Sequence, residues 1–147
     1  MDTEKQKILE DVNRAIIQFR GIYSIWASEH GITYNEMLVL YTIRESGYCT
    51  QKQICEQYLL PKQTIHNVIT QLRKAGILEN DETRRDSREK AFILTARGKE
   101  YAAPFMNSLN AVEERALTLT GEDKLRSLTQ LLLEYGQMLQ QALKESR

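Results

Sequence analysis

The sequence predicts a mainly α-helical protein in which one short β hairpin interrupts a series of amphipathic helices. Apolar stripes with helical spacing run near both ends of the chain, and capping signals divide the region between them. The helical period is lost between residues 77 and 94, where two short apolar runs flank a polar span. A length of 147 residues, 41% of them hydrophobic and 27% charged, fits one globular unit.

Composition excludes several other classes of protein. Two cysteines, Cys49 and Cys55, are too few for a disulfide scaffold and are not spaced like a zinc ribbon. No apolar run approaches the roughly 18 residues of a membrane span, and the first residues lack the apolar core of a signal peptide. We therefore expect a cytoplasmic protein with reduced thiols, no metal and no cofactor.

The two terminal stripes alternate steps of three and four residues, which is the spacing of a heptad seam. Their clearest members are Leu9, Val12, Ile16, Phe19, Leu128, Leu132, Tyr135 and Leu139. Both helices could pack on the core of their own chain. Because one small domain seldom needs two such broad apolar faces, we favour packing against a second copy. The sequence thus predicts a homodimer, with dimerisation helices in residues 1–32 and 100–147.

The region between them, residues 33–99, reads as a separate lobe. Thr33 and Thr50 each open a helix with a capping box, and Gly47 and Gly76 are placed to end helices. Pro61 fits the first turn of a helix that runs to residue 75, after a tight break at residues 59–60. Two helices joined in this way form a helix-turn-helix.

A basic hairpin follows the second helix. Its tip carries Arg84, Arg85, Arg88 and Lys90, and the middle third of the chain is basic although the whole chain has a net charge of zero. A helix-turn-helix followed by such a hairpin is a winged helix-turn-helix. This order of elements predicts that one helix enters the major groove of DNA while the wing reaches the flanking backbone.

The second helix has the amphipathic character that groove recognition requires. Its apolar face is Ile65, Val68, Ile69 and Leu72. The DNA-contacting residues predicted on and around its other face are Lys62, Gln63, Thr64, His66, Asn67, Thr70 and Lys74. Asn and Gln can pair with adenine, and Lys can contact phosphate. A plain solvent face is the alternative, and a winged helix that docks a protein instead of DNA is a second one.

The run Asp86-Ser87-Arg88, followed by Leu94-Thr95 and then Gly98, resembles the wing signature of the MarR family of transcription regulators. The resemblance covers nearly the whole chain. It implies a homodimeric repressor or activator, often relieved by a small ligand or by thiol oxidation. It also implies that Arg88 enters the minor groove, that Asp86 orients the wing by pairing with an arginine, and that Thr95 caps the next helix. We expect a ligand-responsive repressor on a palindromic operator in double-stranded DNA.

A group of aromatic and neighbouring side chains near the first two helices could be core or could line a pocket for a small aromatic effector. Its members are Tyr23, Trp26, His30, Tyr34, Met37 and Tyr41. A thiol-based redox regulator is a further alternative, but the chain has no cysteine near the start of the first helix, where the family's oxidation sensors carry one. No glycine-rich phosphate loop or nucleophile–histidine pair is visible, so no enzyme activity is expected.

Overall fold

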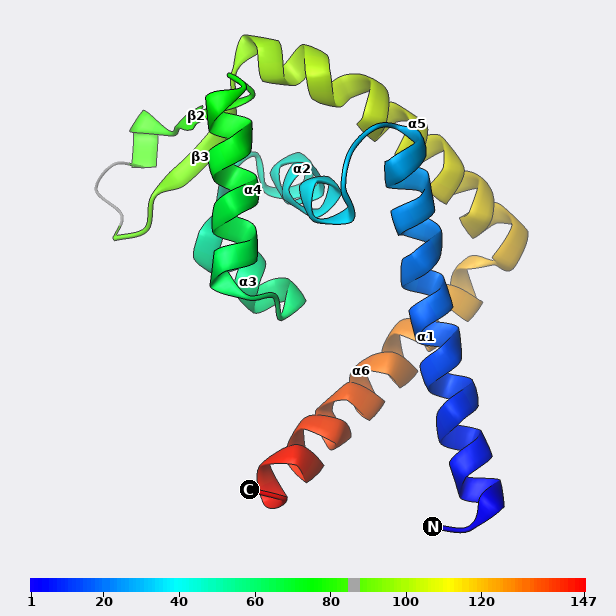
Figure 1. Cartoon of the computed structure of the whole chain (residues 1–147). Coiled ribbons are helices and arrows are strands. Elements are labelled where there is room, and N and C mark those ends of the chain that lie inside the picture. Colours follow the sequence, from blue (N-terminus) through cyan, green and yellow to red (C-terminus); the bar gives the residue numbers. More distant parts are fainter. Residues whose placement is uncertain (85–87) are drawn as a thin grey trace. The chain divides into compact units, whose positions relative to one another are not determined.

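The computed structural model describes residues 1–84 and 88–147. Six α-helices and three β-strands lie in this part of the chain (Figure 1). The helices are α1 (Thr3–Glu29), α2 (Tyr34–Ser46), α3 (Gln51–Tyr58), α4 (Lys62–Lys74), α5 (Ala96–Thr120) and α6 (Glu122–Glu145). The strands are β1 (Cys49–Thr50), β2 (Leu78–Asn80) and β3 (Ala91–Leu94), and a 3-10 turn, η1, covers Glu82–Arg84. The predicted helical fold with a small wing is confirmed.

The chain forms two compact units, residues 1–106 and residues 107–147. The first contains α1 to α4, the sheet and the first turns of α5. The second contains the rest of α5 and α6. The predicted boundary between residues 99 and 100 falls inside α5. The assignment of residues 1–32 and 100–147 to dimerisation stays a prediction.

Local hydrogen bonds explain where the helices of the lobe begin and end. Thr50 and Gln53 form the complete capping box, with each side chain bonded to the other residue's backbone amide at 3.0 and 3.2 Å. Thr33 caps α2 through the Glu36 amide at 3.1 Å. Gly76 follows α4 with a φ of +76° and closes the end of the helix, as predicted.

One helix start differs from the prediction. Pro61 is the N-cap of α4 and not part of its first turn. The predicted helix is present, and its boundary moves by only one residue. At the other end of the chain, Thr120 is the last residue of α5, and Gly121, which has no side chain to form a hydrogen bond, precedes α6.

The wing is a three-stranded antiparallel sheet with the order β1-β3-β2. Leu78 pairs with Leu94, and Cys49 pairs with Phe92. The sequence predicted the β2–β3 hairpin but not β1. A two-residue strand is too short to show the alternation by which a strand is recognised.

The core of the lobe joins α4 to the sheet and to α2 and α3. Its fully or nearly fully buried members include Val39, Cys49, Ile54, Ile65, Ile69, Leu72, Ile77, Leu78 and Phe92. The predicted apolar face of α4 is thereby confirmed, with Val68 half-buried at its margin.

The start of α5 is held against the exit from α4. Thr95 caps α5 through the Gly98 amide at 2.9 Å, as the resemblance implied, and its hydroxyl also donates to the Gly76 carbonyl at 2.5 Å. A Cβ atom on Gly98 would lie 2.1 Å from the Ile77 carbonyl oxygen. Only glycine permits this close approach.

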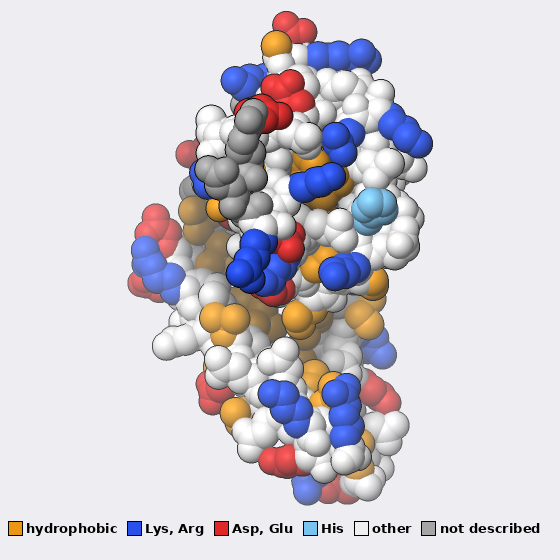
Figure 2. Space-filling view, turned by 90° about the vertical axis from the view of Figure 1, so that its left-hand side faces the viewer, with side chains coloured by type: hydrophobic (Ala, Val, Ile, Leu, Met, Phe, Trp, Pro, Cys, Tyr) orange, Lys and Arg blue, Asp and Glu red, His pale blue; other side chains and the backbone are white. Residues whose placement is uncertain are grey.

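The terminal helices expose apolar side chains. In the first unit, Ile16 and Phe19 on α1 are 43% and 57% exposed. In the second unit, Leu132 and Leu139 on α6 are 43% and 56% exposed. Leu9, Val12 and Tyr135 are half-buried, and Leu128 is exposed. Figure 2 shows such hydrophobic side chains open to solvent on one face of the molecule.

Candidate nucleic-acid interface

A polar contact joins the two helices of the helix-turn-helix. Gln51, at the start of α3, donates from Nε2 to the Lys62 carbonyl at the start of α4, at 3.2 Å. Leu59 turns the chain with a φ of +52° and is the single residue other than glycine with positive φ in the described ranges 1–84 and 88–147. The N-cap Pro61 gives α4 no side-chain hydrogen bond. The first amides of α4 therefore remain available to an anion such as a phosphate.

The outward face of α4 carries the predicted polar residues. Lys62, Gln63, His66, Asn67 and Lys74 are exposed, and Thr64 and Thr70 are half-buried. Gln63 donates from Nε2 to Asn67 Oδ1 at 2.9 Å. This bond does not use the Gln63 carbonyl oxygen or the Asn67 amide nitrogen. One acceptor beside one donor complements the N6 donor and N7 acceptor of adenine.

The structure brings the recognition helix and the wing together around one recess of about 240 Å³. His66 and Thr70 from α4 line it, as do Arg88 and Lys90 from the wing. These four residues were predicted separately, from two different elements. Their shared recess is positively charged overall, because Glu89 is the one acidic residue among its described lining residues.

Arg73 is a lining residue that the sequence reasoning missed. It lies in the same recess, and its guanidinium carbon sits 5.4 Å from the ring centroid of Phe92 on β3. Arg73 follows Thr70 by three positions and His66 by seven, so helical spacing places it on the same face of α4. That spacing was the signal that could have identified it.

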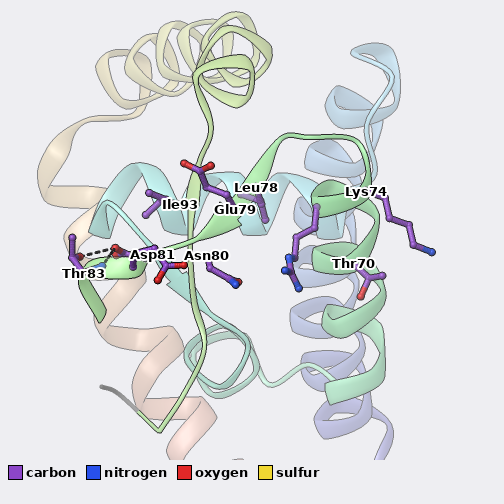
Figure 3. Close-up of a pocket in the computed structure, with 10 residues that line it drawn as sticks. Thr70, Lys74, Leu78, Glu79, Asn80, Asp81, Thr83 and Ile93 are labelled. Atoms are coloured by element: carbon purple, nitrogen blue, oxygen red, sulfur yellow. Dashed lines mark hydrogen bonds between the residues drawn. The ribbon is translucent and has the colours of Figure 1, made fainter. Parts of the chain in front are cut away.

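A larger groove of about 840 Å³ runs between α4 and β2 (Figure 3). Thr70, Arg73 and Lys74 line it from α4. Glu79, Asp81 and Glu82 line it from β2 and the residues after it. A polyanion therefore meets favourable charge on the helix side and repulsion on the strand side. The basic side chains of this region share the face drawn in Figure 2 with several acidic ones.

The two described arginines of the wing, Arg84 and Arg88, have different surroundings. Arg88 and Lys90 are exposed. Arg84 instead donates from Nε to Asp81 Oδ2 at 3.1 Å, and its guanidinium carbon lies 3.7 Å from the ring centroid of Tyr48. Hydrogen bonds from Thr83, together with Arg84, hold the pKa of Asp81 below its ordinary value. The predicted residues Arg85 and Asp86 lie outside the described residues.

The predicted aromatic group near α1 and α2 is engaged in contacts within the chain. Trp26 stacks on His30 with ring centroids 4.4 Å apart. Arg20 covers the ring of Tyr34, and Arg44 covers that of Tyr41. Tyr23 packs against Phe19, and Met37 is buried. Trp26 Nε1 is buried without a hydrogen-bond partner among the described residues.

A second aromatic contact, not predicted, lies next to this group. The Tyr101 hydroxyl donates to Glu36 Oε1 at 2.6 Å, and burial together with that carboxylate raises the pKa of Tyr101. Phe105 lies edge-on to both Tyr101 and His30. The α5 residues that join the aromatic group could not be assigned from local spacing, because they are distant in sequence.

Neither cysteine has the environment of a reactive thiol. Cys49 is fully buried, and burial raises its pKa to about 12. Burial also raises the pKa of Cys55, although Lys62 acts in the opposite direction. A reactive thiol requires a lowered pKa and access to solvent. These environments disfavour the redox alternative.

No group of three or more histidine, cysteine, aspartate or glutamate side chains is placed to hold a metal ion in residues 1–84 and 88–147. Across the same residues, no helix combines the length and the apolar character that crossing a bilayer demands.

Solved structures similar to this chain share its winged helix-turn-helix architecture. A MarR family regulator from Neisseria meningitidis is 29% identical, with a TM-score of 0.86, and the match covers 95% of this chain and 98% of that one. NadR in complex with 4-hydroxyphenylacetate is 20% identical, with a TM-score of 0.69, and the match covers 84% of this chain and 91% of that one. MarR from Staphylococcus aureus in complex with salicylate and kanamycin is 15% identical, with a TM-score of 0.67, and the match covers 95% of this chain and 95% of that one. At these last two identities the likeness shows the fold alone.

The fold and the α4–wing arrangement define a winged helix-turn-helix protein. A family model described as the MarR family matches residues 30–89, the segment from the end of α1 into the wing. A comparison with curated protein sequences gives no match. In residues 30–89 the chain matches the MarR family of transcription regulators, and over 95% of its length it is similar to a MarR family regulator. Proteins of that family are dimeric, DNA-binding transcription factors without enzyme activity.

Proposed function

We propose that the protein is a homodimeric, ligand-responsive repressor that reads a palindromic operator. The observation that carries the proposal is the recess shared by α4 and the wing, in which His66, Thr70, Arg88 and Lys90 come together. One face of the lobe thereby offers base-reading and phosphate-binding side chains at adjacent positions. A wing that docks a protein has little use for such a cluster of cations.

In the proposed complex each protomer contributes one half of the contacts. Gln63 and Asn67 read base edges in the major groove, and Lys62 with the uncapped amides of α4 holds a phosphate. Lys74 contacts the backbone beside the groove. Arg88 enters the flanking minor groove, where a narrow A·T-rich sequence attracts a cation. Thr64 and Arg85 complete the proposed contacts.

The proposed dimer forms through the exposed apolar residues of the terminal helices. Ile16 and Phe19 on α1, and Leu128, Leu132 and Leu139 on α6, are exposed in the single chain. A homodimer with two-fold symmetry places its recognition helices about one helical turn of DNA apart, roughly 34–36 Å. The operator should then be an imperfect palindrome of roughly 16–20 base pairs.

Selection of bound fragments from a genomic DNA library tests this proposal. The expected result is enrichment of a palindrome, with log affinity falling linearly and steeply against log salt concentration. No enrichment, repeated with protein refolded to remove bound ligand, would contradict it. That result would favour the winged-helix module that docks a protein.

The effector we propose is a small aromatic acid. Two structures of the same fold were solved with such compounds, 4-hydroxyphenylacetate and salicylate. In this chain Trp26 has a buried Nε1 without a hydrogen-bond partner among the described residues, and its ring stacks on His30. Tyr23, Tyr34, Met37 and Tyr41 are the other residues proposed for the effector site. A buried donor of this kind favours an acceptor from a ligand.

Titration of the protein with salicylate and with 4-hydroxyphenylacetate tests the effector. Trp26 is the one tryptophan of the chain, so its fluorescence reports this region alone. We expect saturable quenching and a parallel loss of operator affinity. Unchanged fluorescence together with unchanged operator affinity would contradict an effector of this class.

A further inference from the structure

The root of the wing, where β2 leaves the sheet, is organised around a buried carboxylate. Asp81 is 9% exposed, and its amide donates to the Ala91 carbonyl on β3 at 2.9 Å. Its Oδ1 accepts from the Thr83 amide at 3.1 Å and from the Thr83 hydroxyl at 2.6 Å (Figure 3). These bonds fold the chain into the turn η1 directly after the strand.

Arg84 closes this turn and connects it to the other edge of the sheet. Its amide donates to the Asp81 carbonyl at 3.1 Å, and its Nε donates to Asp81 Oδ2 at 3.1 Å. Its guanidinium carbon lies 3.7 Å from the ring centroid of Tyr48. Tyr48 directly precedes β1, and the strand order β1-β3-β2 puts β1 and β2 on opposite edges. One side chain thus bridges two edges of the sheet.

We propose that Asp81, Arg84 and Tyr48 form a wing anchor, in which Arg84 is a positioning residue and not a phosphate contact. The anchor sets the direction in which the chain leaves the sheet towards Arg88. This inference rests on the proposed function, in which the wing enters DNA. It reverses the prediction that the basic side chain of Arg84 contacts the DNA backbone.

The energetics favour anchoring over phosphate binding. To reach a phosphate, Arg84 would have to leave a carboxylate that is almost fully buried, and an unpaired buried charge is costly. The geometry also requires arginine and not simply a positive charge. The planar guanidinium donates along its edge to Asp81 while its face lies on the Tyr48 ring, whereas an ammonium group acts as a point charge.

Arg84→Lys separates the two roles, because lysine keeps the charge but loses the planar group. We expect operator affinity to fall roughly fivefold to tenfold, with the salt dependence of the wild type. Tyr48→Leu should cause a loss of similar size although it removes no charge. Arg126→Lys is the matched control, since the pairing partners of Arg126 among the described residues are its helix neighbours Glu122 and Asp123 on α6. If Arg84→Lys retains full affinity while Arg84→Ala lowers the salt slope by about one, Arg84 is a phosphate contact and the anchor is wrong.

A double-mutant cycle with Arg88→Ala tests whether the anchor acts through the wing. If the anchor positions Arg88, then Arg84→Lys should have little further effect once Arg88 is removed. A general loss of folding would instead lower affinity by the same factor in both backgrounds. An equal loss of affinity from Arg84→Lys with and without Arg88 would contradict a positioning role for Arg84.

Hydrogen exchange of the free protein provides a measurement that needs no DNA. The Thr83 and Arg84 amides donate to Asp81, so Arg84→Lys and Asp81→Asn should both speed their exchange. The Met37 amide, bonded to the Thr33 carbonyl at the start of α2, should exchange as in the wild type. Unchanged protection at Thr83 and Arg84 overturns the anchor. If Arg88→Ala leaves affinity intact while exchange accelerates as expected, the proposed role of Arg88 fails and the anchor stands.

Discussion

The recognition helix α4 and the terminal helix α6 both carry apolar stripes in the sequence, but only one of the stripes is buried. Ile65, Ile69 and Leu72 on α4 are at most 5% exposed, whereas Leu132 and Leu139 on α6 are 43% and 56% exposed. The stripe of α4 is covered by the chain's own sheet and helices. The stripe of α6 has no such cover, and covering it with a second copy would gain about 1.5–3 kcal/mol for each fully buried leucine.

Helical spacing reveals an apolar face but not the partner that covers it. The outward face of α4 is the more informative one. Gln63 and Asn67 are hydrogen-bonded to each other there, and both residues are exposed.

The largest effect should come from charging the exposed stripe. Leu132→Glu with Leu139→Glu should give a monomer whose operator affinity is lower by about a hundredfold or more, because the two half-sites are no longer bound together. Sedimentation and operator titration measure both changes. Gln130→Glu, an exposed polar position on the same helix, is the control and should stay dimeric. A double variant that remains a dimer would place the interface elsewhere.

Gly98→Ala should disrupt the packing between the exit from α4 and the start of α5. The new Cβ would meet the Ile77 carbonyl at 2.1 Å, so the exit from α4 and the start of α5 must separate. We expect a loss of about 2–4 kcal/mol in the free energy of unfolding, measured by urea denaturation. Gly21→Ala on α1 is the matched control, because its Cβ meets no atom within 4 Å. Gly21→Ala should raise the free energy of unfolding by about 0.5–1 kcal/mol. Equal behaviour of the two variants would refute the close-approach argument.

Asn67→Ala tests the outward face of α4 without touching its core. Operator binding should weaken by about 1–3 kcal/mol and become less selective at one base pair, while binding to unrelated DNA stays the same. Gln71→Ala removes an exposed amide from the same helix outside the proposed contacts and should leave both affinities unchanged. A uniform loss on all DNA would instead identify Asn67 as a backbone contact.

The pH dependence of stability tests the buried charge at the wing root. Hydrogen bonds from Thr83 and Arg84 lower the pKa of Asp81, so its stabilising contribution is present above the ordinary pKa of a carboxyl group. That contribution is lost as the pH falls through the lowered, folded-state pKa. Glu82, Glu89 and Lys90 share the hollow around Asp81. The stability difference between wild type and Asp81→Asn should therefore be constant near neutral pH and shrink in strong acid. A difference that varies between pH 6 and 8 would contradict this.

Leu59→Gly should have the smallest effect. Leu59 has a φ of +52° and is 75% exposed, so its side chain adds strain and little packing. Relief of that strain should raise the free energy of unfolding by about 0.5–1 kcal/mol, seen as a higher melting temperature. A destabilised variant would show that Leu59 makes contacts that its exposure hides.

Much of the lobe could be predicted because its signals are local. The Thr50 capping box, the Gly76 helix end and the apolar face of α4 all depend on residues within a few positions of one another. The contact of Arg84 with Tyr48 could not be predicted in this way. It depends on the pairing of β1 with β3, and β1 is only two residues long.

The same distinction applies to the interface. The polar residues of α4 were identified from helical spacing. Their meeting with Arg88 and Lys90 was not, because it needs the hairpin to fold back along α4. Arg73 was missed although its position on the helix fitted the same spacing.

The separation of the two faces of α4 has a consequence for how such regulators diverge. Positions 63, 66 and 67 are exposed, while positions 65, 69 and 72 are buried. Substitutions at the first set alter which bases are contacted and leave the hydrophobic core untouched. Stability and operator preference can therefore change independently after gene duplication, and a new specificity can be installed in this scaffold without redesigning its fold.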